Sequence, residues 1–149
     1  MPSPNSVSLH RVLITTPEKV WRAFTHSDAF ARWLPPNGFT ALVHDMNVKV
    51  GGSYRMSFTN FTTQADMLLG GKHLELRENE CIAYTASFED PNLPGEMTTR
   101  ATIKPVSVGV EIQITQSGIP SMIPVEGCYL GWQDSLKHLA RLVEPNIAG

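Results

Sequence analysis

The chain has 149 residues, of which 12 are Lys or Arg and 14 are Asp or Glu, giving a formal net charge of −2 at pH 7. Because the basic residues are scattered along the sequence, the sequence indicates no basic field for nucleic acid, and we expect no nucleic-acid partner. Cys81 and Cys128 are too few for a disulfide framework or a zinc site, so both are expected to be buried, reduced thiols.

Length and hydropathy predict a single cytoplasmic domain. A chain of 149 residues can bury roughly two thirds of its unfolded surface in one core. We therefore expect one domain over 1–149, with a disordered Pro/Ser tail at 1–5. The sequence contains no signal segment and no run of about 18 apolar residues, so no membrane span is expected.

The chain opens with a predicted strand and helix. Apolar and polar residues alternate from Val7 to Leu13, which is typical of a half-buried strand, and the strand is expected to end at Thr15. Thr16 then offers an N-cap hydroxyl to a helix that begins at Pro17, where a missing N–H is harmless. The expected buried side of this helix consists of Val20, Trp21 and Phe24.

A second short helix is predicted directly afterwards. Ser27 or Asp28 is expected to cap it, and Pro35 and Pro36 cannot continue it. Its apolar residues are Phe30, Trp33 and Leu34.

From residue 39 to 116 apolar residues recur at every second position, instead of about every 3.6 residues as in the preceding helices. This spacing indicates antiparallel strands separated by turns. Six strands are predicted, at 39–47, 53–60, 66–76, 80–89, 97–105 and 108–116. Strand alternation places apolar side chains on one face of the sheet and polar ones on the other. The expected apolar face consists of Tyr54, Met56, Phe58, Ile82, Tyr84, Ala86, Phe88, Met97, Thr99, Ala101, Ile103, Val110, Ile112 and Ile114.

The last predicted element is a long amphipathic helix from Pro124 to Val143. Gly127 and Gly131 lie inside it, although each costs about 1 kcal/mol relative to Ala in a helix interior. This helix is the only long one available to cover the apolar face of the sheet. Its expected buried stripe consists of Val125, Tyr129, Trp132, Leu136, Leu139 and Val143.

Five short motifs carry a resemblance to a known family. They are VKVGGSYR at Val48–Arg55, GKHLEL at Gly71–Leu76, IAYT at Ile82–Thr85, Gly-Ile-Pro at 118–120 and Gly-Trp at 131–132. They resemble the domain family named after activators of heat-shock-protein-90 ATPase, in the SRPBCC or START-like group. The resemblance implies an α+β helix-grip (Bet v 1-like) fold of order β-α-α-β6-α, with a curved seven-stranded antiparallel sheet around the C-terminal helix.

The resemblance also implies a hydrophobic cavity between the sheet and the last helix, which family members use for lipids, aromatic natural products or cyclase-type reactions. Flexible and aromatic side chains on the expected inner face suit an adaptable pocket, although an ordinary core with Met as gap filler explains them as well. The candidate ligand-binding residues are Trp33, Tyr54, Met56, Phe58, Met67, His73, Glu75, Tyr84, Phe88, Met97, Gly131 and Trp132.

His73 and Glu75 are the only candidates for a polar pair in the cavity. They lie two apart on one strand and so point to the same side, which the resemblance implies is the inner one, unless the strand is bulged near Gly70 and Gly71 or both side chains lie at a solvated rim. The histidines show no metal-ligand spacing, and the sequence has no nucleophile motif or phosphate loop. We therefore expect no metal and no cofactor.

Three functions remain open at this stage. The favoured one is binding of a small hydrophobic or aromatic molecule, and an enzyme is less favoured. The first alternative is a chaperone-associated or other protein-interaction module, for which an exposed Leu130 on the last helix is a weak sign. The second is a cyclase or hydrolase that uses the same cavity. The sequence does not define the oligomeric state.

Overall fold

A computed structural model of the chain describes residues 5–149, and its elements follow the predicted order. The bounds are β1 (Val7–Leu13), α1 (Pro17–Thr25), α2 (Ser27–Trp33), β2 (Phe39–Met46), β3 (Ser53–Asn60), β4 (Asp66–Arg77), β5 (Cys81–Phe88), β6 (Met97–Val106), β7 (Gly109–Ser117) and α3 (Val125–Val143). Of the predicted tail, residues 1–4 lie outside the described residues. The carbonyl of Asn5 accepts a hydrogen bond from the amide of Ile119.

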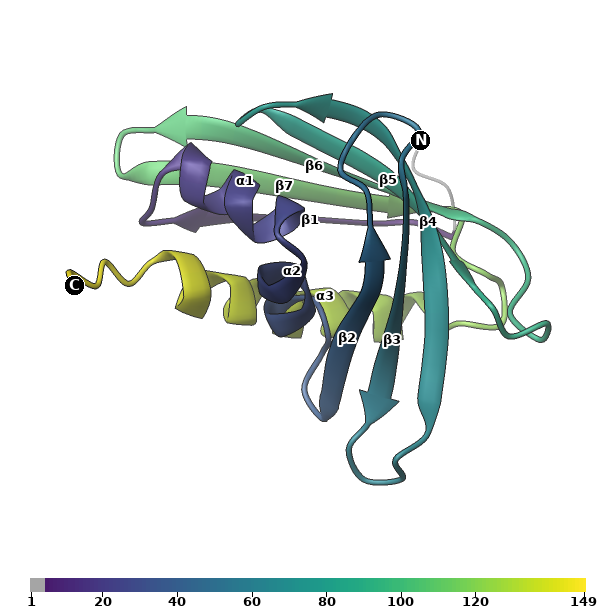
Figure 1. Cartoon of the computed structure of the whole chain (residues 1–149). Helices are drawn as coiled ribbons and strands as arrows, with labels where there is room; N and C mark the ends of the chain where they lie inside the picture. The colour runs from purple at the N-terminus through teal and green to yellow at the C-terminus, as the bar shows by residue number, and fades with distance from the viewer. Residues whose placement is uncertain (1–4) are drawn as a thin grey trace.

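The seven strands form one antiparallel sheet in the order β1-β7-β6-β5-β4-β3-β2. Figure 1 shows that β2, β3 and β4 turn away from the direction of β1, β6 and β7, so the sheet curves around α3. Helices α1 and α2 lie beside the C-terminal half of α3. The predicted helix-grip fold is thus confirmed. Within the described residues, no helix is both long and apolar enough to cross a membrane.

Local chemistry explains where α1 begins and why the predicted cap of α2 is wrong. The hydroxyl of Thr16 accepts from the amide of Lys19 at 3.3 Å and caps α1, as predicted. Only His26 separates the two helices, and its extended backbone ends α1 and begins α2 without a side-chain cap. Ser27 is therefore already helical and cannot serve as the N-cap.

The helix α3 is buried mainly in its second half. Trp132, Leu136, Leu139 and Val143 are buried as predicted, whereas the Tyr129 side chain is 37% exposed. The prediction of a buried stripe along the whole helix was therefore wrong for its first two turns. Val125 and Cys128 of these turns pack only partly against the core, and Cys128 lines a space on the concave side of the sheet.

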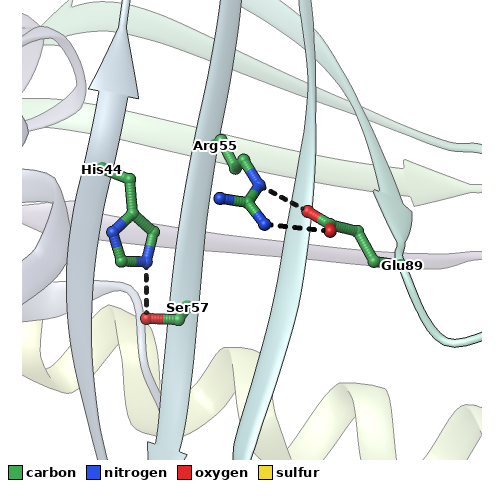
Figure 2. Close-up of polar contacts among 4 residues, drawn as sticks. All are labelled: His44, Arg55, Ser57 and Glu89. Atoms are coloured by element: carbon green, nitrogen blue, oxygen red, sulfur yellow. Dashed lines mark hydrogen bonds and ion pairs between the residues drawn. The ribbon is translucent and has the colours of Figure 1, made fainter.

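The convex face of the sheet carries polar pairs, as alternation predicts. Figure 2 shows Arg55 of β3 bound through two nitrogens to the Glu89 carboxylate, at 2.8 and 3.1 Å. On the neighbouring strand the His44 Nε2 atom lies 3.0 Å from the Ser57 hydroxyl oxygen. Neither pair belongs to the lining of the space under α3.

Candidate functional site

An apolar cavity of about 190 Å³ lies between the concave face of the sheet and the N-terminal half of α3. Its deep end is made of buried residues, and the half-exposed residues mark the side that faces solvent. The buried lining residues are Tyr54, Leu69, Tyr84, Ala86, Met97, Thr99, Trp132 and Ser135. The half-exposed ones are Leu34, Pro36, Phe58, Phe88, Gln116, Ile123, Cys128 and Gly131.

The structure brings most of the predicted ligand-binding residues together in this lining. Those that line the cavity are Tyr54, Phe58, Tyr84, Phe88, Met97, Gly131 and Trp132. They come from β3, β5, β6 and α3, and Leu69 of β4 and Gln116 of β7 complete the lining, so the cavity depends on the packing of the last helix over five strands. The predicted residues that the structure places elsewhere are Trp33, Met56, Met67, His73 and Glu75.

Trp33 belongs to the helical part of the core. Its ring meets Phe24 edge-on at a centroid distance of 4.8 Å and Phe30 at 5.6 Å. Its Nε1–H donates to the carbonyl of Ala23 at 2.8 Å, so the side chain is fully buried and satisfied. The prediction that Trp33 contributes to a ligand site is therefore corrected to a packing role.

Met56, Met67 and His73 also lie outside the cavity lining. Met56 is fully buried in the core, and Met67 is half-buried near the start of β4, opposite Phe58. His73 is buried under the loop between β2 and β3, where its Nδ1 atom lies 3.3 Å from the Gly52 carbonyl oxygen. Its ring is directed to this loop rather than to the cavity.

Glu75 lies on the convex face, contrary to the prediction of an inward pair with His73. The register between β4 and β5 shifts after His73, so one extra residue reverses the side on which Glu75 lies. The carboxylate accepts from Arg77 at 2.7 Å and from Arg100 at 3.0 Å. Because of the bulge, Glu75 belongs to an ion-pair cluster on the surface of the sheet and does not line the cavity.

This ion-pair cluster predicts a pH-dependent effect of the Glu75→Gln substitution. The hydrogen bond from Arg100 holds the pKa of the Glu75 carboxyl below its usual range. A carboxyl with a lowered folded-state pKa stabilises the fold above its unfolded pKa, and this contribution is lost as the pH falls through the folded value. Urea unfolding should thus show a small wild-type advantage at pH 7 that decreases as the pH falls below the ordinary pKa of glutamate, about 4.3. A difference that does not change with pH would contradict this account.

A short chain of polar groups crosses the cavity wall from α3 to the sheet. The Trp132 indole N–H donates to Gln116 Oε1 at 3.1 Å, and Gln116 Nε2 donates to Thr99 Oγ1 at 3.2 Å. Separately, the Tyr54 hydroxyl donates to the carbonyl of Thr85 at 2.6 Å. Thr99 and Gln116 thus place hydrogen-bonding groups beside an otherwise apolar space.

The ionisable groups that line the cavity are held neutral at pH 7. Burial raises the pKa of Tyr54, and the nearby Tyr84 raises it further. Burial also raises the pKa of Tyr84, although a hydrogen bond with Thr99 opposes the shift, and burial raises the pKa of the Cys128 thiol. Because the described lining contains no carboxylate, imidazole, ammonium or guanidinium group, it suits a neutral ligand.

Gly131 faces open space. A Cβ atom added there would meet no heavy atom within 4 Å apart from its own helix backbone, and the residue lines the cavity. The missing side chain therefore leaves room in the cavity. Gly127, one turn earlier, also faces open space but is exposed and does not line the cavity.

The lining includes residues that were not among the predicted site residues. Strand alternation placed Thr99 on the inner face, and Gln116 lies on the same face two residues after Ile114. The position of both side chains could therefore be predicted from the sequence. Cys128 is half-buried rather than buried as predicted, while Cys81 is fully buried, and neither forms a disulfide. Leu69 lies two residues after Met67 on β4, so alternation also placed it on the inner face, whereas no strand periodicity pointed Leu34 or the Pro36 ring to the cavity.

A curved antiparallel sheet around a C-terminal helix, with an apolar cavity between them, defines the Bet v 1-like class of proteins. The family described as "Activator of Hsp90 ATPase homolog 1-like protein" matches residues 15–144, and the chain belongs to this family. The comparison with curated proteins gives no match.

Solved structures of bacterial proteins share this fold. Protein CV1439 from Chromobacterium violaceum is 50% identical in sequence, with a TM-score of 0.95 over 97% of this chain and 100% of that chain. A protein from Rhodobacter sphaeroides is 17% identical, with a TM-score of 0.80 over 94% and 92% of the two chains. Protein NE0264 from Nitrosomonas europaea is 18% identical, with a TM-score of 0.80 over 95% of this chain and 96% of that chain. The last two likenesses concern the fold alone.

Proposed function

We propose that the protein binds a small, neutral, mainly apolar molecule in the cavity under α3. The observation that carries this proposal is a cavity of about 190 Å³ whose mostly apolar lining includes the Thr99 and Gln116 side chains. Ligand sites in proteins combine an apolar surface with a few placed polar groups in this way. A neutral ligand fits because the described residues of the lining carry no charged group at pH 7.

The volume limits the size of the ligand. An apolar cavity of about 150 Å³ is large enough to bind benzene, so 190 Å³ fits one aromatic ring with substituents or a compact pair of rings. It is smaller than the roughly 300 to 1,000 Å³ of pockets that enclose drug-sized ligands. A long acyl chain or a sterol would therefore extend beyond the cavity through its half-exposed side.

Isothermal titration calorimetry with ligands of graded size tests this proposal. We expect p-cresol, p-xylene and indole to bind with dissociation constants of roughly micromolar to millimolar, and a four-ring sterol to bind at least tenfold more weakly than indole. Each small ligand should also raise the thermal midpoint, because binding to the folded state stabilises it. Failure of all three small ligands to bind at millimolar concentration would contradict the proposal.

The Gln116→Leu substitution should change the selectivity of the cavity. A ligand hydroxyl beside Gln116 and Thr99 can join their hydrogen bonds, and losing a buried partner costs about 1 to 3 kcal/mol. We therefore expect p-cresol to bind roughly five- to a hundredfold more weakly to the variant, while p-xylene changes little. Equal effects on both ligands would show that Gln116 acts through shape rather than hydrogen bonding.

A second candidate function is contact with a protein partner. The Leu130 side chain is 63% exposed on the first half of α3, and Met122 just before the helix is 65% exposed. The family description names activators of the Hsp90 ATPase, which act on a chaperone. The ATPase rate of purified Hsp90, measured with the protein and with its Leu130→Glu variant, tests this role. Stimulation that the variant lacks would support it, and an unchanged rate with both would exclude this activity.

A further inference from the structure

A second hollow, separate from the cavity, lies between α1, α2 and the C-terminal end of α3. It has a volume of about 830 Å³ and shares no lining residue with the cavity under α3. Figure 1 shows the chain after α3 running on beside this end of the helices. We call it the basic groove, and its lining is Lys19, Arg22, Arg32, His138, Arg141, Leu142, Pro145, Asn146 and Ile147.

The groove concentrates positive charge in a protein with a net negative charge. Lys19, Arg22, Arg32 and Arg141 come from three helices and make up four of the 12 Lys and Arg residues. No Asp or Glu belongs to the described lining. The sequence did not reveal this concentration, because the four residues are spread from position 19 to position 141.

The cations of the groove have no carboxylate partner in the described part of the chain. Within the described residues, the Asp and Glu side chains that form ion pairs do so with Arg55, Arg77 and Arg100, which lie on the sheet and not in the groove. Glu144, at the end of α3, is directed elsewhere, because its carboxylate accepts from the amide of Ile14 at 2.9 Å. The guanidinium groups of the groove are thus free to bind carboxylates, which they match in geometry through paired N–H donors.

Hydrogen bonds hold the walls of the groove in place. The Lys19 ammonium donates to the carbonyl of Pro145 at 2.7 Å, which ties the segment after α3 to α1. The His138 ring lies 3.0 Å from the Pro35 carbonyl through Nδ1 and 2.8 Å from Asn37 Oδ1 through Nε2. The groove is therefore a built feature rather than a gap between independent surface side chains.

The lining also provides apolar contacts. Leu142 and Pro145 lie among the cations, and the Ile147 side chain is 88% exposed. A smaller hollow of about 130 Å³ shares Lys19, Arg22 and Leu142 with the groove and extends it toward Ala23 and Ala29. The combined surface is far larger than a single phosphate group and alternates cationic with apolar contacts.

We propose that the basic groove binds an acidic polypeptide segment in which Asp or Glu residues flank an apolar side chain. The carboxylates pair with the arginines of the three helices, and the apolar side chain contacts Leu142. Since the groove and the cavity share no residues, this interaction goes beyond the proposed binding of a small molecule, and each can be tested without the other.

Fluorescence anisotropy with a labelled eight-residue peptide of Asp and Glu around a central Leu tests the proposal. The variant is the double charge reversal Arg22→Glu/Arg141→Glu. The matched control is Lys72→Glu/Lys104→Glu, which makes the same change in net charge at exposed positions on the sheet. We expect the groove variant to bind at least tenfold more weakly and the control within about threefold of the wild type. Binding should also weaken between 50 and 200 mM salt, because salt screens exposed charges.

Several results would overturn the proposal. They are no binding of the peptide at low salt, equal binding of its Asn/Gln analogue, and equal weakening in the groove variant and the control. Inorganic tripolyphosphate provides a further arm of the test. If it binds with the same dependence on Arg22 and Arg141 while the peptide does not, the groove takes phosphates and the peptide proposal is wrong. Thermal midpoints and circular dichroism spectra of each variant should match the wild type, which excludes misfolding as the cause.

Discussion

The Gly131→Leu substitution is expected to abolish binding of p-cresol and indole while the protein remains folded. The new side chain enters the open space that the glycine leaves in the cavity lining, so it occupies the volume that a ligand needs. Replacing a glycine inside α3 also recovers up to about 1 kcal/mol of helix propensity. Calorimetric titration and urea unfolding, performed on the same preparation, measure the two effects.

Gly127→Leu is the matched control for this experiment. It makes the same change one turn earlier on α3, at an exposed position that also faces open space but does not line the cavity. We expect a similar gain in helix propensity and unchanged ligand binding. If Gly131→Leu instead destabilised the protein by about 1 to 3 kcal/mol, the space would be packed and the substitution would be an overpacking change. Unchanged binding in Gly131→Leu would place the ligand elsewhere.

Trp33→Ala is expected to cause the largest loss of stability, without removing the ligand site. The ring is fully buried, packs against Phe24 and Phe30, and donates to the carbonyl of Ala23. Truncation of such an aromatic residue costs about 3 to 5 kcal/mol, which lowers the thermal midpoint of a chain of this size by roughly 10 °C. Because Trp33 does not line the cavity, the fraction that remains folded should still bind p-cresol.

Trp21→Ala provides the comparison, since Trp21 lies on the same helix pair but is only half-buried. Its cost should be clearly smaller than that of Trp33→Ala. Urea unfolding at 15 °C, followed by calorimetric titration below the transition, separates stability from binding. A stable Trp33→Ala protein that no longer binds p-cresol would contradict the packing role and return Trp33 to the ligand site.

Strand alternation predicted which strand residues face the concave side of the sheet, whereas the cavity itself was implied by the family resemblance. Tyr54, Tyr84 and Met97 were placed on the inner face because side chains alternate strictly along a regular strand, and the structure has them in the lining. Gly131 was singled out because a glycine inside a helix is costly, and it faces open space. The face of each of these residues followed from local periodicity, and their assignment to a ligand cavity followed from the resemblance.

Other features depend on contacts that local patterns do not contain. Glu75 was placed on the wrong face because a bulge after His73 reverses the alternation, and nothing in the sequence determines on which side of Gly71 the bulge falls. The prediction for Trp33 failed because an apolar residue on a short helix can face either a cavity or the core. The basic groove joins residues from three helices, so only the tertiary structure reveals it.

The most direct test of the proposed function follows the indole N–H signals of Trp132 and Trp33 by NMR during titration with p-cresol. The Trp132 N–H donates to Gln116 at the cavity wall, whereas the Trp33 N–H donates to Ala23 in the core. We predict a saturable shift of the Trp132 signal with the affinity found by calorimetry, and no comparable shift of the Trp33 signal. An unmoved Trp132 signal at a concentration where p-cresol is bound would contradict the assignment of the cavity under α3 as the ligand site.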